Sequence, residues 1–177
     1  MARLSEATKP TLRDARAMEP LPPHGRMTLR RRFPHPPAAA YAWLTDFDEQ
    51  DAERAGGAVV GERRVVLRER DRVVVEGVLE VAGRRIPARA EVALLPPDRW
   101  RAHIRHARGS LVTFNEYHVA SDGAGGTVLE VRYHFALSTL RHRLRYWLGG
   151  RSILRRELEA MWDGFEAAMA RELAVPA

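Results

Sequence analysis

Cysteine is missing from this sequence of 177 residues, and so is any long hydrophobic run. Without cysteine the chain can form no disulfide, no thiolate metal site and no thiol nucleophile. Nowhere do about 18 apolar residues follow one another, as a membrane-spanning helix requires, and the N-terminus carries no apolar segment of signal-peptide length. The expected location is therefore the cytoplasm.

Lysine is almost absent, because Lys9 is the only one and arginine supplies nearly all of the positive charge. The net charge of +6 leaves an Arg-mediated nucleic-acid interface open as an alternative function. However, arginines alternate with acidic residues in the runs 62–64 and 68–72, which is typical of a solvated face and not of a phosphate track. Nucleic acid is therefore not the expected partner.

Known catalytic and metal-binding motifs are lacking as well. There is no G-x-S-x-G elbow and no P-loop, and the glycines of the stretch 123–126 fall in a turn between two predicted strands. The seven histidines show no ligand spacing such as H-x-x-x-H, so neither a metal nor another cofactor is expected. An enzymatic function would gain support if His106 or Glu69 lay inside a cavity with a perturbed pKa and a hydrogen-bonded partner.

Alternation of apolar and polar residues is abundant, and it predicts β-strands. A first strand is predicted at 27–33, and after a helical stretch the pattern resumes in six further strands, at 62–70, 72–81, 85–95, 99–106, 110–120 and 127–137. The breaks between these six are short and rich in turn-forming residues. Strands that are neighbours in the sequence should therefore be antiparallel neighbours in a sheet.

Helical spacing is found in two places. Pro36-Pro37 precedes two short helical pieces that end at Gly56-Gly57. Near the C-terminus one apolar stripe, in steps of three and four, predicts a helix from Gly150 of about 24 residues and about 36 Å, long enough to cross a small sheet. Residues 1–24 carry four prolines and no sustained period, so we expect a flexible arm there.

Three groups of residues resemble motifs of the START-like superfamily, which includes polyketide cyclase/dehydrase and lipid-transport domains. They are the segment 33–37 with the helix that follows it to Asp46, the segment 94–100, and Tyr117-His118-Val119 leading through a Gly-rich turn to Gly126. The resemblance covers about residues 25–174. It implies an α+β helix-grip fold, in which a curved seven-stranded antiparallel sheet wraps round a long C-terminal helix, with two short helices after the first strand.

The same resemblance implies a function without naming a reaction. Members of such a superfamily hold a small hydrophobic ligand, such as a lipid or a polyketide, in an apolar cavity between the sheet and the C-terminal helix. Non-catalytic binding or transport is the preferred hypothesis for this chain. A polyketide cyclase or dehydratase that uses the same cavity is the alternative.

The alternation also indicates which side chains face the helix. In the strand 127–137 the odd positions are apolar or aromatic, and placing Tyr117 opposite Val131 sets Glu116 opposite Arg132, a favourable cross-strand pair. The ligand cavity is therefore predicted to be lined by Trp100, Thr113, Asn115, Tyr117, Tyr133, Phe135, Met161, Phe165 and Met169. The alternative is that both tyrosines are core residues whose hydroxyls reach backbone groups or water.

Residues 140–156 combine six arginines with leucines, a tyrosine and a tryptophan, a composition typical of helices that lie on a membrane surface. Arg143, Arg145 and Trp147 are the predicted contacts with an anionic membrane. The alternative is that this segment is only the start of the last helix, with its apolar residues packed against the edge of the sheet.

Overall fold

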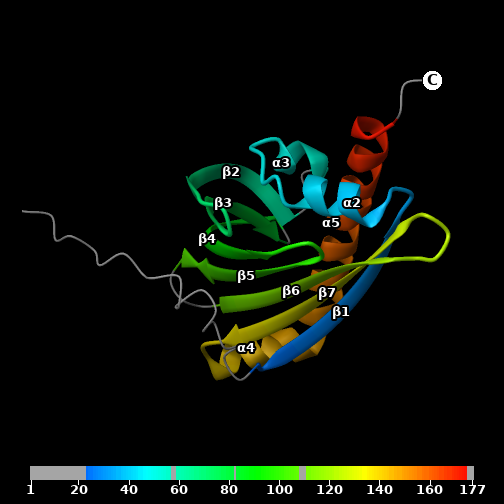
Figure 1. Ribbon diagram of the computed structural model, residues 1–177. Helices are drawn as coiled ribbons and strands as arrows, with labels where there is room; N and C mark the ends of the chain where they lie inside the picture. The colour runs from blue at the N-terminus through cyan, green and yellow to red at the C-terminus, as the bar shows by residue number, and fades with distance from the viewer. Residues whose placement is uncertain (1–22, 57–58, 82, 108–110, 175–177) are drawn as a thin grey trace, which may run out of the picture.

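The computed structural model describes residues 23–56, 59–81, 83–107 and 111–174. Seven antiparallel strands form one sheet in the order β1-β7-β6-β5-β4-β3-β2, and the sheet curves round the long helix α5 (Figure 1). The predicted helix-grip architecture is confirmed. In chain order the elements are β1 (Gly25–Phe33), α2 (Pro37–Leu44), α3 (Asp51–Arg54), β2 (Val59–Arg68), β3 (Arg72–Val81), β4 (Arg84–Leu95), β5 (Arg99–His106), β6 (Leu111–Ser121), β7 (Thr127–Leu137), α4 (Leu140–Arg145), η2 (Tyr146–Gly150) and α5 (Arg151–Glu172).

Most of the predicted arm, residues 1–24, lies outside the described residues. His24 is described, and it is bound to β7 at two points. Its backbone N–H donates to the carbonyl of Phe135 at 2.8 Å, and its ring Nδ1 accepts from the backbone N–H of Leu137 at 3.1 Å. The bonding of the N-terminal segment to β7 therefore begins at His24, one residue before β1.

The pairing of β6 with β7 has the predicted register, with Tyr117 opposite Val131 and Glu116 opposite Arg132. The expected ion pair between Glu116 and Arg132 is not the one that forms. Arg132 reaches along its own strand to Glu130 at 2.7 Å, while Glu116 lies 3.4 Å from Arg101, the residue directly opposite it on β5. A residue of a central strand has an opposite neighbour on each side, so the register with one neighbour does not fix its pair.

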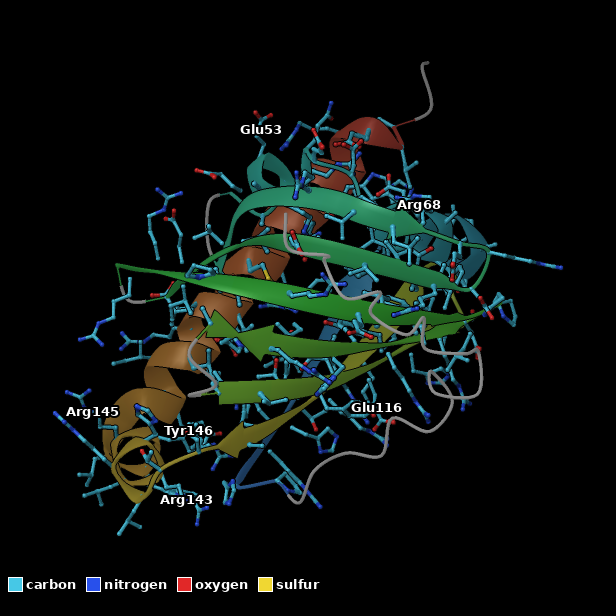
Figure 2. The ribbon with its side chains drawn as sticks, turned by 90° about the vertical axis from the view of Figure 1, so that its left-hand side faces the viewer. Glu53, Arg68, Glu116, Arg143, Arg145 and Tyr146 are labelled. Carbon is cyan, nitrogen blue, oxygen red and sulfur yellow. The ribbon has the colours of Figure 1, made fainter. Side chains whose placement is uncertain are left out.

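The C-terminal helical region changes direction after its first two turns. Helix α4 is capped by the Oγ1 of Thr139, which accepts from the backbone N–H of His142 at 3.2 Å. Within η2, Gly149 has a φ of 130°, a conformation that favours glycine, and the chain then enters α5. This kink separates α4, at one end of the sheet, from the 22-residue helix that crosses it (Figure 2).

The C-terminal half of α5 is fixed tightly to α2 and α3. A Cβ on Gly164 would lie 2.6 Å from the carbonyl carbon of Ala55, so the two backbones touch where only glycine fits. Nearby, the Arg54 guanidinium donates to Glu172 at 2.8 Å, and the indole N–H of Trp43 donates to the same carboxylate at 2.9 Å. These bonds lower the pKa of Glu172, the one from Arg54 most, so its carboxylate is ionised at neutral pH.

Candidate ligand pocket

A pocket of about 440 Å³ lies between the concave face of the sheet and α5. Its walls are largely apolar and come from β2 to β7, the helices α2 and α5, and the kinked segment between α4 and α5. The volume lies within the range of about 300–1,000 Å³ that small-molecule sites occupy. Eight of the nine predicted cavity residues border it, namely Trp100, Thr113, Asn115, Tyr117, Tyr133, Phe135, Met161 and Phe165.

Met169 is the predicted cavity residue that does not border the pocket. It lies one helical turn beyond Phe165, has no exposed surface and belongs to the packed core. The apolar stripe of α5 does mark its buried face. In the last turn, however, that face packs against core side chains and does not border the pocket.

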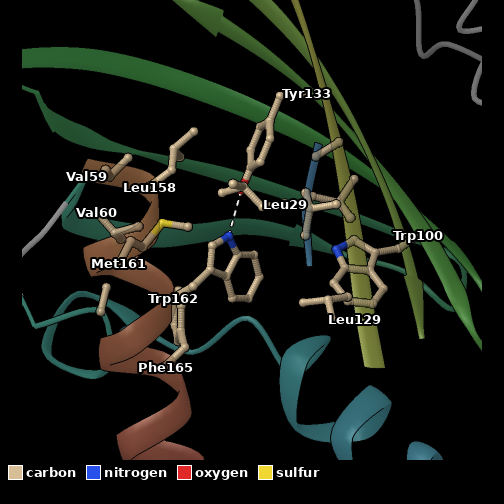
Figure 3. Packing of buried hydrophobic residues seen from close by; sticks show 14 of the residues in the cluster. Leu29, Val59, Val60, Trp100, Leu129, Tyr133, Leu158, Met161, Trp162 and Phe165 are labelled. Carbon is tan, nitrogen blue, oxygen red and sulfur yellow. Dashed lines mark hydrogen bonds between the residues drawn. The ribbon is translucent and has the colours of Figure 1, made fainter. Parts of the chain in front are cut away.

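Aromatic rings form the inner wall. The rings of Trp100 and Tyr117, directly opposite each other on β5 and β6, are stacked with centroids 4.6 Å apart and planes within 5°. Trp162 stands edge-on to Tyr117, with ring centroids 6.4 Å apart. It also packs against Phe165 at 5.5 Å (Figure 3). Trp162 was not among the predicted residues, although its position four residues after Leu158 places it on the same helix face.

Two buried tyrosine hydroxyls lie on this wall, and each already accepts one hydrogen bond. The hydroxyl of Tyr133 accepts from the indole N–H of Trp162 at 2.7 Å (Figure 3). The hydroxyl of Tyr117 accepts from the Nδ2 of Asn115 at 3.1 Å. Burial raises the pKa of Tyr117 and raises that of Tyr133 still further, so both stay protonated. Among the described residues neither hydroxyl donates to an acceptor, so both protons are available to a ligand.

Other polar atoms on the pocket wall are also unpaired within the described part of the chain. They are Oδ1 of Asn115, both ring nitrogens of His106, Nδ1 of His142 and the hydroxyl of Tyr146. A buried polar atom without a partner destabilises a protein by about 1–3 kcal/mol. Their concentration round one hollow is typical of a site whose hydrogen-bonding partners arrive with a ligand or with water.

His106 points inward from the end of β5 and is only 7% exposed. Burial lowers its pKa to about 4, so its imidazole is neutral at pH 7. It has no hydrogen-bonded partner among the described residues, and Glu69 is exposed on the surface. Of the conditions expected for an acid–base catalyst, His106 meets burial and a shifted pKa but not the partner.

A buried ion pair borders the pocket on the side of α3, and it corrects one expectation. The run 62–64 was predicted to be a solvated face, yet Arg63 is half-buried and pairs with the buried carboxylate of Asp51. Arg63 lies on the inner side of β2 with Gly61 and Val65, in regular alternation with the exposed Glu62 and Arg64. Asp51 also binds Arg54 at 3.2 Å, so its charge is compensated twice.

Two exposed arginines, Arg84 and Arg145, border the pocket from the start of β4 and from the end of α4. Gly150 and His142 border it from the same region as Arg145. Among the described residues that line the pocket, Asp51 is the only acid, so the uncompensated charge round the opening is positive. Over the same described ranges, no three His, Asp or Glu side chains gather closely enough to hold a metal ion.

The three predicted membrane contacts are placed differently from one another. Trp147 is 61% exposed. Arg145 is also exposed, at the corner of the molecule that α4 occupies (Figure 2). Arg143 is half-buried, because its Nε donates to the carbonyl of Leu137 at 3.4 Å. None of the described helices is long and apolar enough to cross a bilayer.

Comparison with known proteins gives no match to a family profile and no match to a curated protein sequence. Solved structures do match over most of the chain. The Zhui aromatase/cyclase from Streptomyces sp. R1128 has a TM-score of 0.70 at 13% identity, covering 84% of this chain and 95% of its own. A protein of Thermus thermophilus has a TM-score of 0.69 at 16% identity, covering 84% and 99%.

A START superfamily protein from Mycobacterium smegmatis matches with a TM-score of 0.62 at 9% identity, covering 82% of this chain and 97% of its own. At these identities the likeness concerns the fold. Together with the seven-stranded sheet wrapped round α5, it shows that the chain has the START-like, helix-grip fold.

Proposed function

We propose that this protein binds a small hydrophobic ligand in the pocket between the sheet and α5. The observation that carries the proposal is the pocket itself, a hollow of about 440 Å³ with largely apolar walls and several unpaired polar atoms. The fold supports it, because the aromatase/cyclase and START superfamily structures share the same arrangement of sheet and helix. Binding or transport requires no catalytic group in addition to these pocket residues.

The polar atoms limit what kind of ligand fits. Two phenolic O–H donors, of Tyr117 and Tyr133, lie on neighbouring strands beside the unpaired Oδ1 of Asn115. A purely hydrocarbon ligand would leave these groups unpaired, whereas carbonyl or hydroxyl oxygens would satisfy them. The arginines near the opening, Arg84 and Arg145, favour an acidic group at the outer end of the ligand. We therefore propose an oxygenated aromatic or polyketide-like ligand, or an acidic lipid, over a plain alkane chain.

An enzymatic function, cyclisation or dehydration of a polyketide-like substrate, is the second candidate, and His106 is the observation that favours it. A neutral imidazole at the pocket wall can accept a proton, while a tyrosine hydroxyl stabilises the oxygen on which negative charge develops. Against this, a pKa of about 4 makes His106 a weak base, and no described carboxylate orients its ring. Binding without catalysis is therefore preferred.

Occupation of the pocket can be tested with N-phenyl-1-naphthylamine, a neutral apolar probe that fluoresces when it leaves water. We expect the folded protein to bind it with one saturable site. Ile104 borders the pocket and is half-buried, so Ile104→Trp should fill part of the hollow and weaken binding. Val66→Trp is the matched control, because Val66 is 39% exposed and lies outside the pocket. Equal binding by both variants would contradict the proposal.

Mass analysis of compounds extracted from protein purified from its own host would identify the ligand class. The two candidate functions separate with a thioester of a short poly-β-ketone as substrate. Turnover that falls by about 10²-fold or more in His106→Phe would favour the enzyme. Binding without turnover would favour the carrier.

A further inference from the structure

The segment from α4 to the start of α5 carries most of the exposed apolar surface of the described chain. Seven large hydrophobic residues are strongly exposed in the described ranges, and five of them belong to this segment. Leu140 is 79% exposed and Leu148 78%, values more typical of charged side chains than of leucine. The five are Leu140, Leu144, Trp147, Leu148 and Ile153.

Positive charge surrounds these apolar residues, and negative charge is absent from the sequence there. No acidic residue occurs between Glu130 and Glu157, whereas the described surface elsewhere alternates arginine with glutamate or aspartate in cross-strand pairs. Arg141, Arg145 and Arg151 are exposed and form no ion pair with any described residue. The pairing of arginines with acidic residues that is seen on the strands therefore does not continue into the segment that exposes apolar side chains.

We propose that this surface docks on an anionic lipid bilayer. The apolar set with Arg141, Arg145 and Arg151 is called the α4–η2 face below. Exposed leucines and a tryptophan would insert among the acyl chains near the headgroups, while arginines with long flexible stems would meet lipid phosphates. Neither signal alone gives firm attachment, but apolar insertion and a basic cluster act together.

Charge and placement favour a bilayer over a second copy of this chain. A second copy would have to set the same uncompensated arginines against one another across a symmetric interface. The face also adjoins the pocket, because His142, Arg145, Tyr146 and Gly150 line the hollow from the inner side of the same segment. Docking would therefore turn the pocket towards the lipid, although the docking itself does not depend on any ligand.

Trp147 provides a direct readout. The chain has four tryptophans, and Trp43, Trp100 and Trp162 are at most 8% exposed, whereas Trp147 is 61% exposed. Emission that is accessible to acrylamide therefore comes mainly from Trp147. With vesicles of phosphatidylcholine and phosphatidylglycerol we expect a blue shift, protection from acrylamide and quenching by lipids brominated on the acyl chains. Vesicles of phosphatidylcholine alone should cause much less of each change.

Sedimentation with the same vesicles tests the residues. The triple variant Leu140→Ser/Leu144→Ser/Leu148→Ser should lower the partition coefficient by about tenfold or more, because the apolar area that leaves water is lost. Arg141→Gln/Arg151→Gln should also lower it by about tenfold and reduce its salt dependence. None of these five residues borders the pocket, so probe binding should persist in both variants and the two proposals can fail separately.

Matched controls come from residues outside the α4–η2 face. Val66→Ser/Leu67→Ser removes the two other exposed apolar side chains, and Arg70→Gln/Arg105→Gln removes two exposed arginines of the sheet region. Both should sediment like the wild type. If all variants sediment equally, or if the wild type stays in solution with anionic vesicles, the proposal is wrong. Self-association that the triple serine variant abolishes, without vesicle binding, would assign the face to a second copy and also overturn it.

Discussion

The indole nitrogen of Trp162 and the hydroxyl oxygen of Tyr133 lie 2.7 Å apart in a fully buried hydrogen bond. This bond joins the middle of α5 to the middle of β7 on the wall of the pocket. It is also the reason why the Tyr133 hydroxyl has a fixed direction, since its oxygen is held by a donor from the helix.

Removal of the Tyr133 hydroxyl should destabilise the fold through its partner. Tyr133→Phe leaves the N–H of Trp162 buried without an acceptor, so we expect the free energy of unfolding to fall by about 1–3 kcal/mol. Urea unfolding followed by circular dichroism measures the change. The double variant Tyr133→Phe/Trp162→Phe should lose less free energy of unfolding than the two single variants lose together, because each single change removes the same hydrogen bond. Strict additivity would mean that the bond contributes little.

Tyr117→Phe should lower ligand affinity, and it should also lower stability because the Nδ2 of the buried Asn115 loses its acceptor. The Tyr117 hydroxyl lies on the pocket wall, and its loss removes one ligand hydrogen bond with little change of volume. A bond of this kind contributes roughly 0.5–1.5 kcal/mol, which corresponds to a loss of about twofold to tenfold in affinity. Calorimetry should measure the affinity of wild type and variant for two ligands: an oxygenated aromatic ligand identified by extraction, and the neutral naphthylamine probe. Affinity for the probe should change little, and an equal change for both ligands would contradict a hydrogen-bonding role.

His106 should make the protein less stable as the pH falls below neutrality. Its pKa is lowered from 6.5 to about 4 by burial, so between these values the unfolded chain binds the proton and the native protein does not. Stability therefore rises with pH from about 4 to 6.5 and is constant above. At about 1.4 kcal/mol per pKa unit, the full effect is roughly 3 kcal/mol.

The measurement for His106 is urea unfolding across this range of pH. His106→Phe should flatten the part of the profile between pH 4 and 6.5, because phenylalanine binds no proton. Val66→Phe is the control, because Val66 is 39% exposed and binds no proton, so this variant should leave the profile unchanged. A wild-type slope that survives in His106→Phe would assign the acid sensitivity to other groups.

Arg54 should be the arginine whose loss destabilises the fold most. Its guanidinium is 9% exposed and contacts Asp46, Asp51 and Glu172, and it also lies over the Trp43 ring at 4.8 Å. Arg54→Met would leave the buried carboxylate of Asp51 with Arg63 alone, so we expect a loss of about 3–5 kcal/mol.

Arg64→Met is the matched control for Arg54→Met, because Arg64 is 70% exposed and its pair with Glu76 is solvated. A surface pair of this kind contributes at most about 1 kcal/mol. Similar melting temperatures for both variants would show that the Arg54 contacts are not stabilising.

The sheet was predictable because alternation and burial agree along most strands. In β7 every odd residue from Thr127 to Leu137 is buried, which sets the inward direction of Tyr133, and the charge pairing of Glu116 with Arg132 selected the register that turns Tyr117 inward as well. Most of the candidate pocket follows from the same reasoning, since its wall is one face of a regular sheet.

Other features depend on contacts that no periodic pattern encodes. The charges of Asp51 and Arg63 suggest solvent, yet the two side chains form an ion pair between α3 and β2 in which Asp51 is buried. For the second ion pair of Asp51, the one with Arg54, the i, i+3 spacing of the two residues is a weak signal in the sequence. Likewise Gly149 predicts a break but not its direction, so the separate position of α4 could not be derived from sequence.

The close approach of Gly164 to Ala55 has a mechanical consequence. One half of α5 is held in place, because its backbone touches the segment after α3 at Gly164 and its Glu172 binds Arg54. A rigid helix that is held at one end can move only at the other. The opposite end follows the Gly149 kink and meets β1 through a side chain, with Tyr146 lying against Gly25. Any widening that lets a molecule in or out of the hollow should therefore be a swing of the α4 end, with Gly164 near the pivot.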